Sequence, residues 1–290
     1  MSAVALEQDP AERVAEIEGR ARRVETPCGN GKMVWRIWGE EHPEREPLVL
    51  GHGAQGAWSH WIRNIDALAK DRMVIAVDMP GQGDSATPAR PDHAGISTAL
   101  ATGLREILGP GKQADFAGFS FSGIAFAWFA SYHRELVRRL ILIGCGGLDT
   151  PHGHTDLQPV KGLVGEERMA RLKANLLGLM LHDPDSVDEL ALYLLVANAR
   201  NTRWVQVDLV LPDRLAAALP HVSAQVDAIW GEFDRPHPDP AVQEAVIRRS
   251  HPDCDFRVIA DAGHWAMYER PQAFNETLLD MLRQPLRARG

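Results

Sequence analysis

The chain has 290 residues, 45% of them hydrophobic and 24% charged, so it holds enough apolar material for one large globular domain and is not disordered as a whole. The net charge is −8, and the absence of a long Lys/Arg run argues against nucleic acid as a partner. Three scattered cysteines, Cys28, Cys145 and Cys254, suit neither a disulfide framework nor a zinc site with short ligand pairs.

The N-terminal residues lack the basic and apolar regions of a secretory signal, and no apolar run approaches membrane-spanning length. We therefore expect a cytoplasmic protein with no membrane partner. Residues 1–21 are expected to form an N-terminal extension, whose charged, helix-prone part receives no catalytic role.

After this extension, short β-rich runs alternate with helical patterns, which favours a parallel-rich sheet covered by helices on both faces. The predicted strands are Lys32–Trp38, Leu48–Leu50, Met73–Val77, Ala114–Ala117, Leu140–Ile143, Val226–Trp230 and Phe256–Ile259. The predicted helices are Trp61–Lys70, Ile96–Leu108, Ile124–Tyr132, Ala241–Arg249 and Gln272–Arg283.

One segment, residues 149–220, contains no convincing strand but has helical runs at Glu166–Leu181 and Val187–Ala199. Its density of Leu, Met and Tyr is too high for a linker, so it is predicted to be an inserted helical cap. Residues 22–148 and 221–290 would then form the α/β core.

The sharpest motif is GFSFSG at residues 118–123, which joins a predicted strand to a predicted helix. A serine on such a tight turn is pushed out of the sheet, and small flanking residues relieve the crowding. Ser120 is therefore the candidate nucleophile, although Ser122 stands where the commonest form of the motif has glycine. The alternative interpretation of Ser120 is a helix N-cap hydroxyl.

Upstream, the run LVLGHGA at residues 48–54 ends a strand in a turn suited to an oxyanion donor. Acyl transfer develops negative charge on a carbonyl oxygen, so two backbone N–H groups must already point to it. The candidates are the amides of Ala54 and Phe121. The His52 side chain is expected to brace the turn rather than to transfer protons.

Downstream, Asp234 and His264 each follow a predicted strand, where open α/β sheets keep their ligand sites. Taken alone, Asp234 could be a turn aspartate that binds local amides, and His264 could be an exposed turn histidine. The chain order Ser, Asp, His at strand ends is the order of the α/β-hydrolase triad, so we predict Ser120 as nucleophile, His264 as general base and Asp234 as the acid that orients it.

From about residue 22 to 282 the sequence resembles the α/β-hydrolase superfamily, including a similar turn, DMPGQGDS, at residues 78–85. The resemblance implies the α/β-hydrolase fold, with a mostly parallel eight-stranded sheet, helices on both faces and an inserted helical cap. It also implies a serine hydrolase that needs no cofactor or metal. Motifs similar to those of the meta-cleavage-product hydrolases, which cleave carbon–carbon bonds in dienoates, are Trp230–Gly231, Asp234–Arg235, Pro238, Gly263–Ala266, Glu269 and Phe274–Asn275.

Two positions depart from that narrower group. Phe119 stands where those hydrolases usually have a polar residue, and the run at residues 190–196 lacks their cap arginine for the substrate carboxylate. Arg200 and Arg203 are nearby, but surface charge is the simpler interpretation of both. We therefore expect hydrolysis of an ester or lactone, with carbon–carbon hydrolysis of 2-hydroxy-6-oxo-dienoates as the alternative.

The substrate is expected to be an uncharged, medium-sized apolar small molecule, and a homodimer is the assembly expected of such an enzyme. The serine argues against dehalogenase or epoxide hydrolase activity, because those branches use an aspartate nucleophile. The candidate lining residues, whose alternative role is core packing, are Phe119, Trp265, Leu177, Met180, Leu181 and Tyr193.

Two rival classes stay open. A metal-dependent hydrolase is suggested by the spacing of His152, His154 and Asp156, although no second cluster completes such a site. A protein that keeps the fold but only binds a ligand is the non-enzymatic rival. Cys145, between two glycines at a strand end, is interpreted as a small buried hydrophobe.

Overall fold

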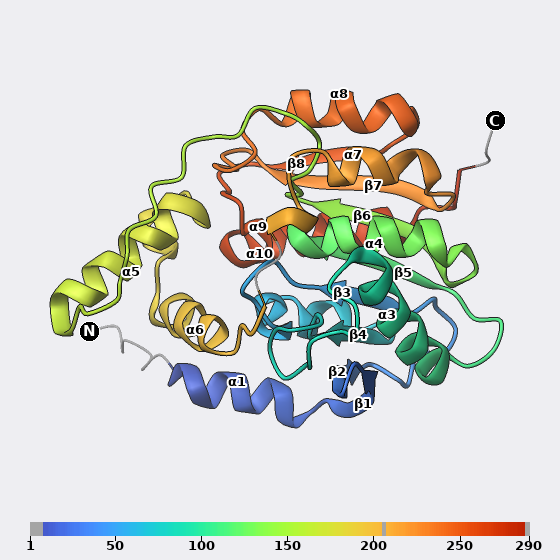
Figure 1. Cartoon of the computed structure of the whole chain (residues 1–290), viewed down its shortest axis with the longest axis horizontal. Coiled ribbons are helices and arrows are strands. Elements are labelled where there is room, and N and C mark those ends of the chain that lie inside the picture. Colours follow the sequence, from blue (N-terminus) through green and yellow to red (C-terminus); the bar gives the residue numbers. More distant parts are fainter. Residues whose placement is uncertain (1–7, 205–206, 288–290) are drawn as a thin grey trace, which may run out of the picture.

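The protein is built on one eight-stranded sheet, seen in a computed structural model that describes residues 8–204 and 207–287 (Figure 1). The spatial order is β1-β2-β4-β3-β5-β6-β7-β8, in which β2 is antiparallel to both neighbours and β3 to β8 are parallel. The strands are β1 (Arg22–Cys28), β2 (Gly31–Trp38), β3 (Leu48–Gly51), β4 (Val74–Val77), β5 (Ala114–Phe119), β6 (Val137–Ile143), β7 (Gln225–Gly231) and β8 (Phe256–Ile259).

The sheet confirms the expected fold class, but the sequence pattern missed strand β1. Its sequence, RRVETPC, carries three charges and Pro27, which give no clear alternation of apolar residues. The strand forms because it is an edge strand that pairs along its whole length with β2, from Arg22 opposite Ile37 to Cys28 opposite Gly31. Tertiary pairing here overrides a weak local preference.

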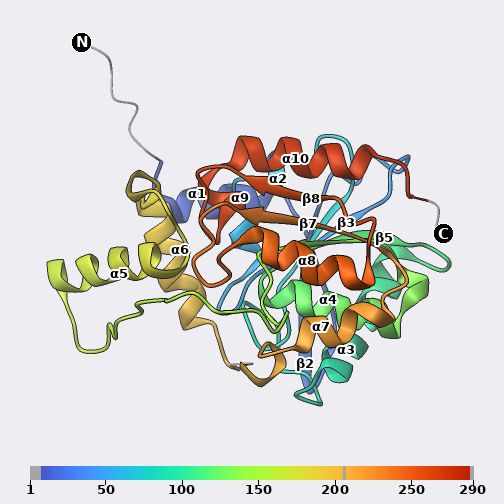
Figure 2. The same cartoon turned by 90° about the horizontal axis from the view of Figure 1, so that it is seen from above.

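Helices cover both faces of the sheet, and most predicted helices lie within three residues of the observed ones (Figure 2). One face carries α3 (His93–Leu108), α4 (Phe121–Tyr132), α7 (Arg214–Ala218) and α8 (Pro240–Ser250). The other face carries α2 (Ile65–Leu68), α9 (Ala266–Glu269) and α10 (Pro271–Arg283). Short 3-10 turns are η1 (Trp58–Trp61), η2 (Arg134–Leu136), η3 (Pro184–Ser186), η4 (Val207–Leu209) and η5 (Leu219–His221).

The prediction of one continuous helix over Trp61–Lys70 was wrong, because this stretch contains the end of η1, a break and then α2. Hydrogen bonds to residues distant in the sequence hold the η1 segment. The Trp58 amide donates to Asp78 Oδ1 at 2.8 Å, and Trp61 Nε1 donates to the Gly51 carbonyl at 3.1 Å. These bonds fix the backbone in a tighter turn than the apolar pattern indicated.

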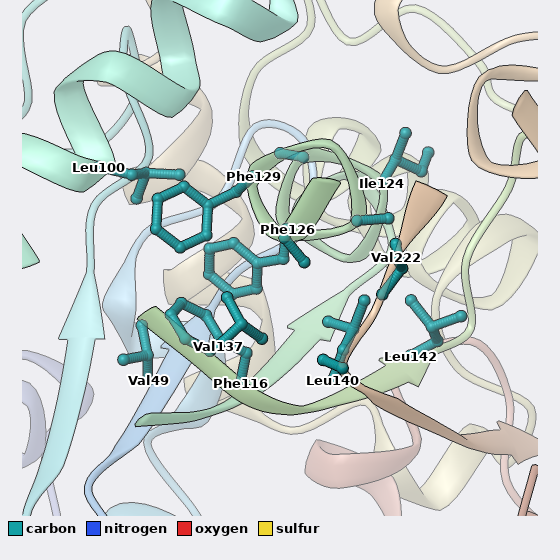
Figure 3. Close-up of a cluster of buried hydrophobic side chains, with 14 of the residues drawn as sticks. Val49, Leu100, Phe116, Ile124, Phe126, Phe129, Val137, Leu140, Leu142 and Val222 are labelled. Atoms are coloured by element: carbon teal, nitrogen blue, oxygen red, sulfur yellow. The ribbon is translucent and has the colours of Figure 1, made fainter. Parts of the chain in front are cut away.

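The sheet separates two buried apolar clusters. Figure 3 shows part of one, in which Phe126 and Phe129 of α4 pack on Phe116 of β5, with ring centroids 5.2 Å and 5.4 Å from the Phe116 ring. Helix α4 is buried along most of its length and has apolar residues on all sides. The strand-to-helix turn that precedes it is therefore held between two rigid elements.

Two helices of the predicted cap segment, α5 (Gly165–Leu179) and α6 (Glu189–Arg200), lie beyond the end of the sheet, whereas α7 packs on α4 (Figures 1 and 2). The N-terminal helix α1 (Pro10–Gly19) contacts α6, and its Ile17 carbonyl accepts from Trp38 Nε1 at 3.0 Å. Within the described ranges, no helix has the length and apolarity needed to cross a membrane.

Candidate active site

Ser120 lies in the sharp turn between β5 and α4, with φ 51° and ψ −113°. A serine in this left-handed region is strained, and such strain is typical of a residue that the surrounding structure holds for function. Its side chain makes no capping hydrogen bond to α4, which argues against the N-cap interpretation. The turn closes tightly, because a Cβ on Gly118 would lie 2.5 Å from the Gly123 Cα.

The departure at Ser122 is accommodated locally. Its hydroxyl donates to the Phe119 carbonyl at 3.0 Å, and its side chain fills the space beside Gly51, where a Cβ would lie 2.5 Å from the Ser122 Cβ. Glycine at residue 51 of β3 therefore makes room for serine at residue 122. The motif keeps its geometry without the more common glycine.

Asp234 and His264 form a buried pair at the carboxyl ends of β7 and β8, with His264 Nδ1 2.8 Å from Asp234 Oδ2. The other carboxylate oxygen, Oδ1, accepts from the His237 amide at 2.9 Å, which fixes the orientation of the carboxylate. The carboxylate is an acceptor, so it favours the tautomer with the proton on Nδ1, and in that tautomer Nε2 can accept a proton.

Gly144, just past β6, lies so close to this pair that a side chain at this position would clash with it. Its φ is 51°, and a Cβ there would lie 2.8 Å from Asp234 Oδ2 and 3.2 Å from His264 Nδ1. Glu269 holds the histidine loop from the other side: Oε2 accepts from the Gly263 amide at 2.6 Å, and Oε1 accepts from the His182 amide at 2.9 Å. Neither Gly144 nor Glu269 was predicted from the sequence to orient the pair.

The turn at residues 52–54 lies against the nucleophile. A Cβ on Gly53 would be 3.5 Å from the Ser120 Cβ, so the residue that precedes Ala54 lies beside Ser120. His52 is buried: its Nε2 accepts from the Met79 amide at 2.9 Å, and its Nδ1 lies 2.7 Å from the Gly53 carbonyl. Burial lowers the pKa of His52, so the neutral ring braces the turn, as expected from the sequence.

The other amide expected in the oxyanion site belongs to Phe121, the first residue of α4. The first amides of a helix have no acceptor within the helix, so this N–H is available to a substrate oxygen. Phe121 adjoins Ser120 at the start of α4, whereas Ala54 belongs to the turn that follows β3.

Most of the expected lining residues gather around His264. The Phe119 ring lies 4.9 Å from the His264 ring, and the Met180 carbonyl accepts from the Trp265 amide at 2.7 Å. Phe119, Trp265 and Leu181 are buried in the apolar cluster on this face, and Leu177 and Met180 pack against it.

Tyr193 lies apart from this group. It is 38% exposed and lines a cavity of about 180 Å³ with Trp58, Asp84 and Asn198, between α1, η1 and α6. The structure therefore places five of the six expected lining residues around one buried cluster and Tyr193 at a separate cavity.

The two arginines near the predicted cap helix differ in their contacts. Arg200 is exposed at the last position of α6, and the Arg203 guanidinium donates to the carbonyls of Gly83 at 2.7 Å and Ser85 at 2.6 Å. Throughout residues 8–204 and 207–287, no group of three or more His, Cys, Asp and Glu side chains could hold a metal ion. His152 instead lies with its ring 5.6 Å from that of His237.

The chain matches a family model described as the alpha/beta hydrolase family over residues 48–277. A 2-hydroxy-6-oxononadienedioate/2-hydroxy-6-oxononatrienedioate hydrolase of Comamonas testosteroni is 30% identical over 271 residues, which cover 87% of this chain and 93% of the relative. A 2-hydroxy-6-oxo-6-phenylhexa-2,4-dienoate hydrolase of the same species is 28% identical and covers 84% and 90%.

Solved structures resemble the chain in fold. A carboxylesterase from Bacillus subtilis has a TM-score of 0.75 at 19% identity, with coverage of 96% of this chain and 97% of that chain. The naproxen esterase from Bacillus subtilis has a TM-score of 0.73 at 19% identity, with coverage of 95% and 97%.

Proposed function

Because the chain belongs to the α/β-hydrolase family, we propose that this hydrolase cleaves a carboxylic ester or lactone of a medium-sized apolar acid, through an acyl-enzyme on Ser120. The observation that carries the proposal is the buried pair of His264 Nδ1 and Asp234 Oδ2, 2.8 Å apart, at the same end of the sheet as the strained Ser120. Such a pair is what an alcohol nucleophile needs for activation at neutral pH.

In the proposed mechanism, His264 Nε2 takes the proton of the Ser120 hydroxyl while its oxygen attacks the substrate carbonyl carbon. Asp234 stabilises the imidazolium that forms and holds its tautomer. The amides of Ala54 and Phe121 stabilise the tetrahedral oxyanion, and His264 then protonates the leaving alcohol. Water deprotonated by His264 attacks the acyl-enzyme and releases the acid.

The contacts of the site favour a neutral acyl group over a carboxylate. Phe119 places an apolar ring 4.9 Å from the ring of His264, and Arg203 is bound to the loop at residues 83–85. A buried carboxylate without a cationic partner is strongly disfavoured, so a dienoate substrate would lose much of its binding energy here.

The second candidate function is carbon–carbon bond hydrolysis of 2-hydroxy-6-oxo-dienoates. It is favoured by the curated relatives of 28–30% identity, which carry that activity in their names and match most of the chain. Both functions use the same three residues, so only substrate preference distinguishes them.

The test compares kcat/KM for a short-chain nitrophenyl ester and for a ring-fission dienoate, using the wild type, Ser120→Ala and Ser122→Ala. We expect the ester to be preferred and Ser120→Ala to lose at least about 10³-fold in kcat. Ser122→Ala is the matched control from the same turn, and it should retain most of the activity because its hydroxyl bonds only to the Phe119 carbonyl.

A preference for the dienoate would establish the second function and direct attention to the residue that binds its carboxylate. More than a few percent of activity in Ser120→Ala would contradict both functions.

A further inference from the structure

The connection between α5 and α6, residues 180–188, lies against the loop that carries His264. The amide of Trp265, just after His264, donates to the Met180 carbonyl at 2.7 Å. Just before His264, a Cβ on Gly263 would be only 2.8 Å from the nearest backbone nitrogen of the connection. The backbone on both sides of His264 therefore contacts the α5–α6 connection.

Glu269 is a second link between these two segments. Its side chain is buried, and Oε1 accepts from the amides of His182 at 2.9 Å and Asp183 at 2.6 Å. The other oxygen, Oε2, accepts from the Gly263 amide at 2.6 Å. Hydrogen bonds to a carboxylate are stronger than those between neutral groups. One buried carboxylate thus holds the connection and the residue before His264 at a fixed separation.

The same connection also reaches the residue before Asp234. The His182 ring stacks on the Phe233 ring, with the ring centroids 3.9 Å apart and an interplanar angle of 13°. The Phe233 amide donates to the Ala262 carbonyl at 2.8 Å, so the two catalytic loops are also bound to each other. His182 therefore contacts the loop of Asp234 through its ring and Glu269 through its backbone.

The far end of the connection is fixed to the same part of the core. Asp188 caps α6 by accepting from the Ala191 amide at 2.8 Å, and it also accepts from the Tyr268 hydroxyl at 2.5 Å. Arg63 pairs with Asp188 as well, and its guanidinium lies 3.9 Å from the centroid of the Tyr268 ring. A displacement of α5 or α6 is then transmitted to the loop of His264, because packed and hydrogen-bonded contacts join them without a break.

We propose that the α5–α6 connection is a positioning element for the pair of Asp234 and His264, with Glu269 and His182 as its positioning residues. The proposal rests on acyl transfer at Ser120, which needs His264 aligned with both the carboxylate and the serine hydroxyl. Each positioning residue acts through the backbone beside one member of the pair. It goes beyond the proposed function, because the two cap helices then affect the rate of proton transfer as well as the shape of the site.

The first test is a double-mutant cycle that combines Glu269→Gln with Asp234→Asn, with kcat and KM measured on a nitrophenyl ester. Glutamine replaces one acceptor oxygen by a donor, so Glu269→Gln should lower kcat by about 10²-fold at unchanged KM, a loss typical of a misplaced catalytic group. In the Asp234→Asn background the same change should lower kcat by less than about threefold, because the interaction that Glu269 positions is already lost.

Arg270→Gln is the matched control from the next position in the chain. Arg270 also ties the connection to the core, but through side chains, with Nη2 2.9 Å from Asp183 Oδ2. Because this ion pair is partly exposed, Arg270→Gln should leave kcat within about twofold of the wild type. A loss of kcat equal to that of Glu269→Gln would contradict the positioning role of Glu269.

The second test changes only the connection. His182→Ala removes the ring from Phe233 but keeps the backbone amide, and it should lower kcat by about threefold to tenfold at unchanged KM. His182→Phe keeps a flat ring on Phe233 and should restore most of the loss. His182 is exposed, so these two variants test the proposal even if Glu269→Gln does not fold. A purely structural role would lower the melting temperature and leave kcat per folded molecule unchanged.

A loss from Glu269→Gln that is as large in Asp234→Asn as in the wild type would overturn the proposal. An unchanged kcat in His182→Ala would overturn it as well. Persistent ester turnover in Ser120→Ala would instead contradict acyl transfer at Ser120, so the two failures are distinguishable.

Discussion

Strand β7 connects two buried carboxylates that have opposite tasks. Asp227, near its start, is bound by Arg139, with Nη1 3.2 Å from Asp227 Oδ2, and by Arg287, while Asp234, three residues past its end, faces His264. A guanidinium is permanently charged, so the Asp227 site can only hold the fold together. An imidazole gains and loses a proton near neutrality, so the Asp234 site can take part in chemistry.

The partners of each site support the same contrast. Arg139 also donates to the carbonyls of Met281 and Gln284, at 2.5 Å and 2.7 Å, and so ties β6 and β7 to the end of α10. The Asp234 pair instead has Gly144 on one side and the neutral rings of His237 and Phe119 beside His264. Burial of a carboxylate therefore says little about function until the proton-binding ability of its partner is known.

The largest effect is expected for Asp234→Asn. The amide can no longer favour the His264 tautomer with a proton on Nδ1, so kcat should fall by about 10³- to 10⁴-fold. Steady-state kinetics would measure this loss, and Asp227→Asn on the same strand is the control, with kcat per folded molecule close to the wild type. Equal losses of kcat in the two variants would contradict the different roles of Asp227 and Asp234.

Asp227→Ala should affect stability rather than activity. It leaves the buried Arg139 without its carboxylate, which typically costs about 3–5 kcal/mol of unfolding free energy. Urea unfolding measures the loss. Adding Arg139→Met should recover part of it, because the unpaired charge is removed, and a double variant as unstable as the sum of both single changes would contradict this explanation.

A smaller effect is expected from pH. Burial is the main cause that lowers the pKa of His237 to about 4, against about 6.5 in an unfolded chain. Asp234 opposes this shift in pKa, and His264 adds to it. Between these values the unfolded chain binds a proton that the folded chain does not, so stability should fall as pH decreases from 6.5 to 4.

The slope from this one group is at most about 1.4 kcal/mol per pH unit. Urea unfolding at pH 7, 6 and 5 measures it, and His237→Phe should make the dependence shallower. An unchanged slope in that variant would show that His237 is not the group responsible.

The smallest effect is expected from thiol reagents. Burial raises the pKa of the Cys28 thiol to about 11 and that of Cys254 to about 12, and it raises that of Cys145 further. Thiolates are then scarce at pH 8, so iodoacetamide should leave the native protein unlabelled and fully active, while urea-unfolded protein is labelled at three sites. Mass spectrometry would count the labels, and rapid native labelling of any cysteine would contradict its buried state.

The local sequence was enough to predict most of the framework. Runs such as Leu48–Leu50 and Leu140–Ile143 are apolar because parallel strands are buried on both faces. The apolar run alone is therefore enough to identify each of them as a strand. The helices α5 and α6 were also predicted to within two residues at each end. The chain order of Ser120, Asp234 and His264 at strand ends predicted that these residues lie at one edge of the sheet, because parallel strands bring their carboxyl ends together, and the pair of Asp234 and His264 is observed there.

Only the tertiary structure decided the rest, because the relevant contacts join segments far apart in the chain. Strand β1 exists through pairing with β2, and Glu269 acts by binding amides of residues 182 and 263. His60, just before the predicted helix at Trp61–Lys70, received no role from the sequence, and only the fold brings its ring to 5.8 Å from that of Phe119 and 4.9 Å from that of Trp265. Local periodicity reports which residues are buried, but the partner that each buried polar group meets, or lacks, is set by the packing of distant elements.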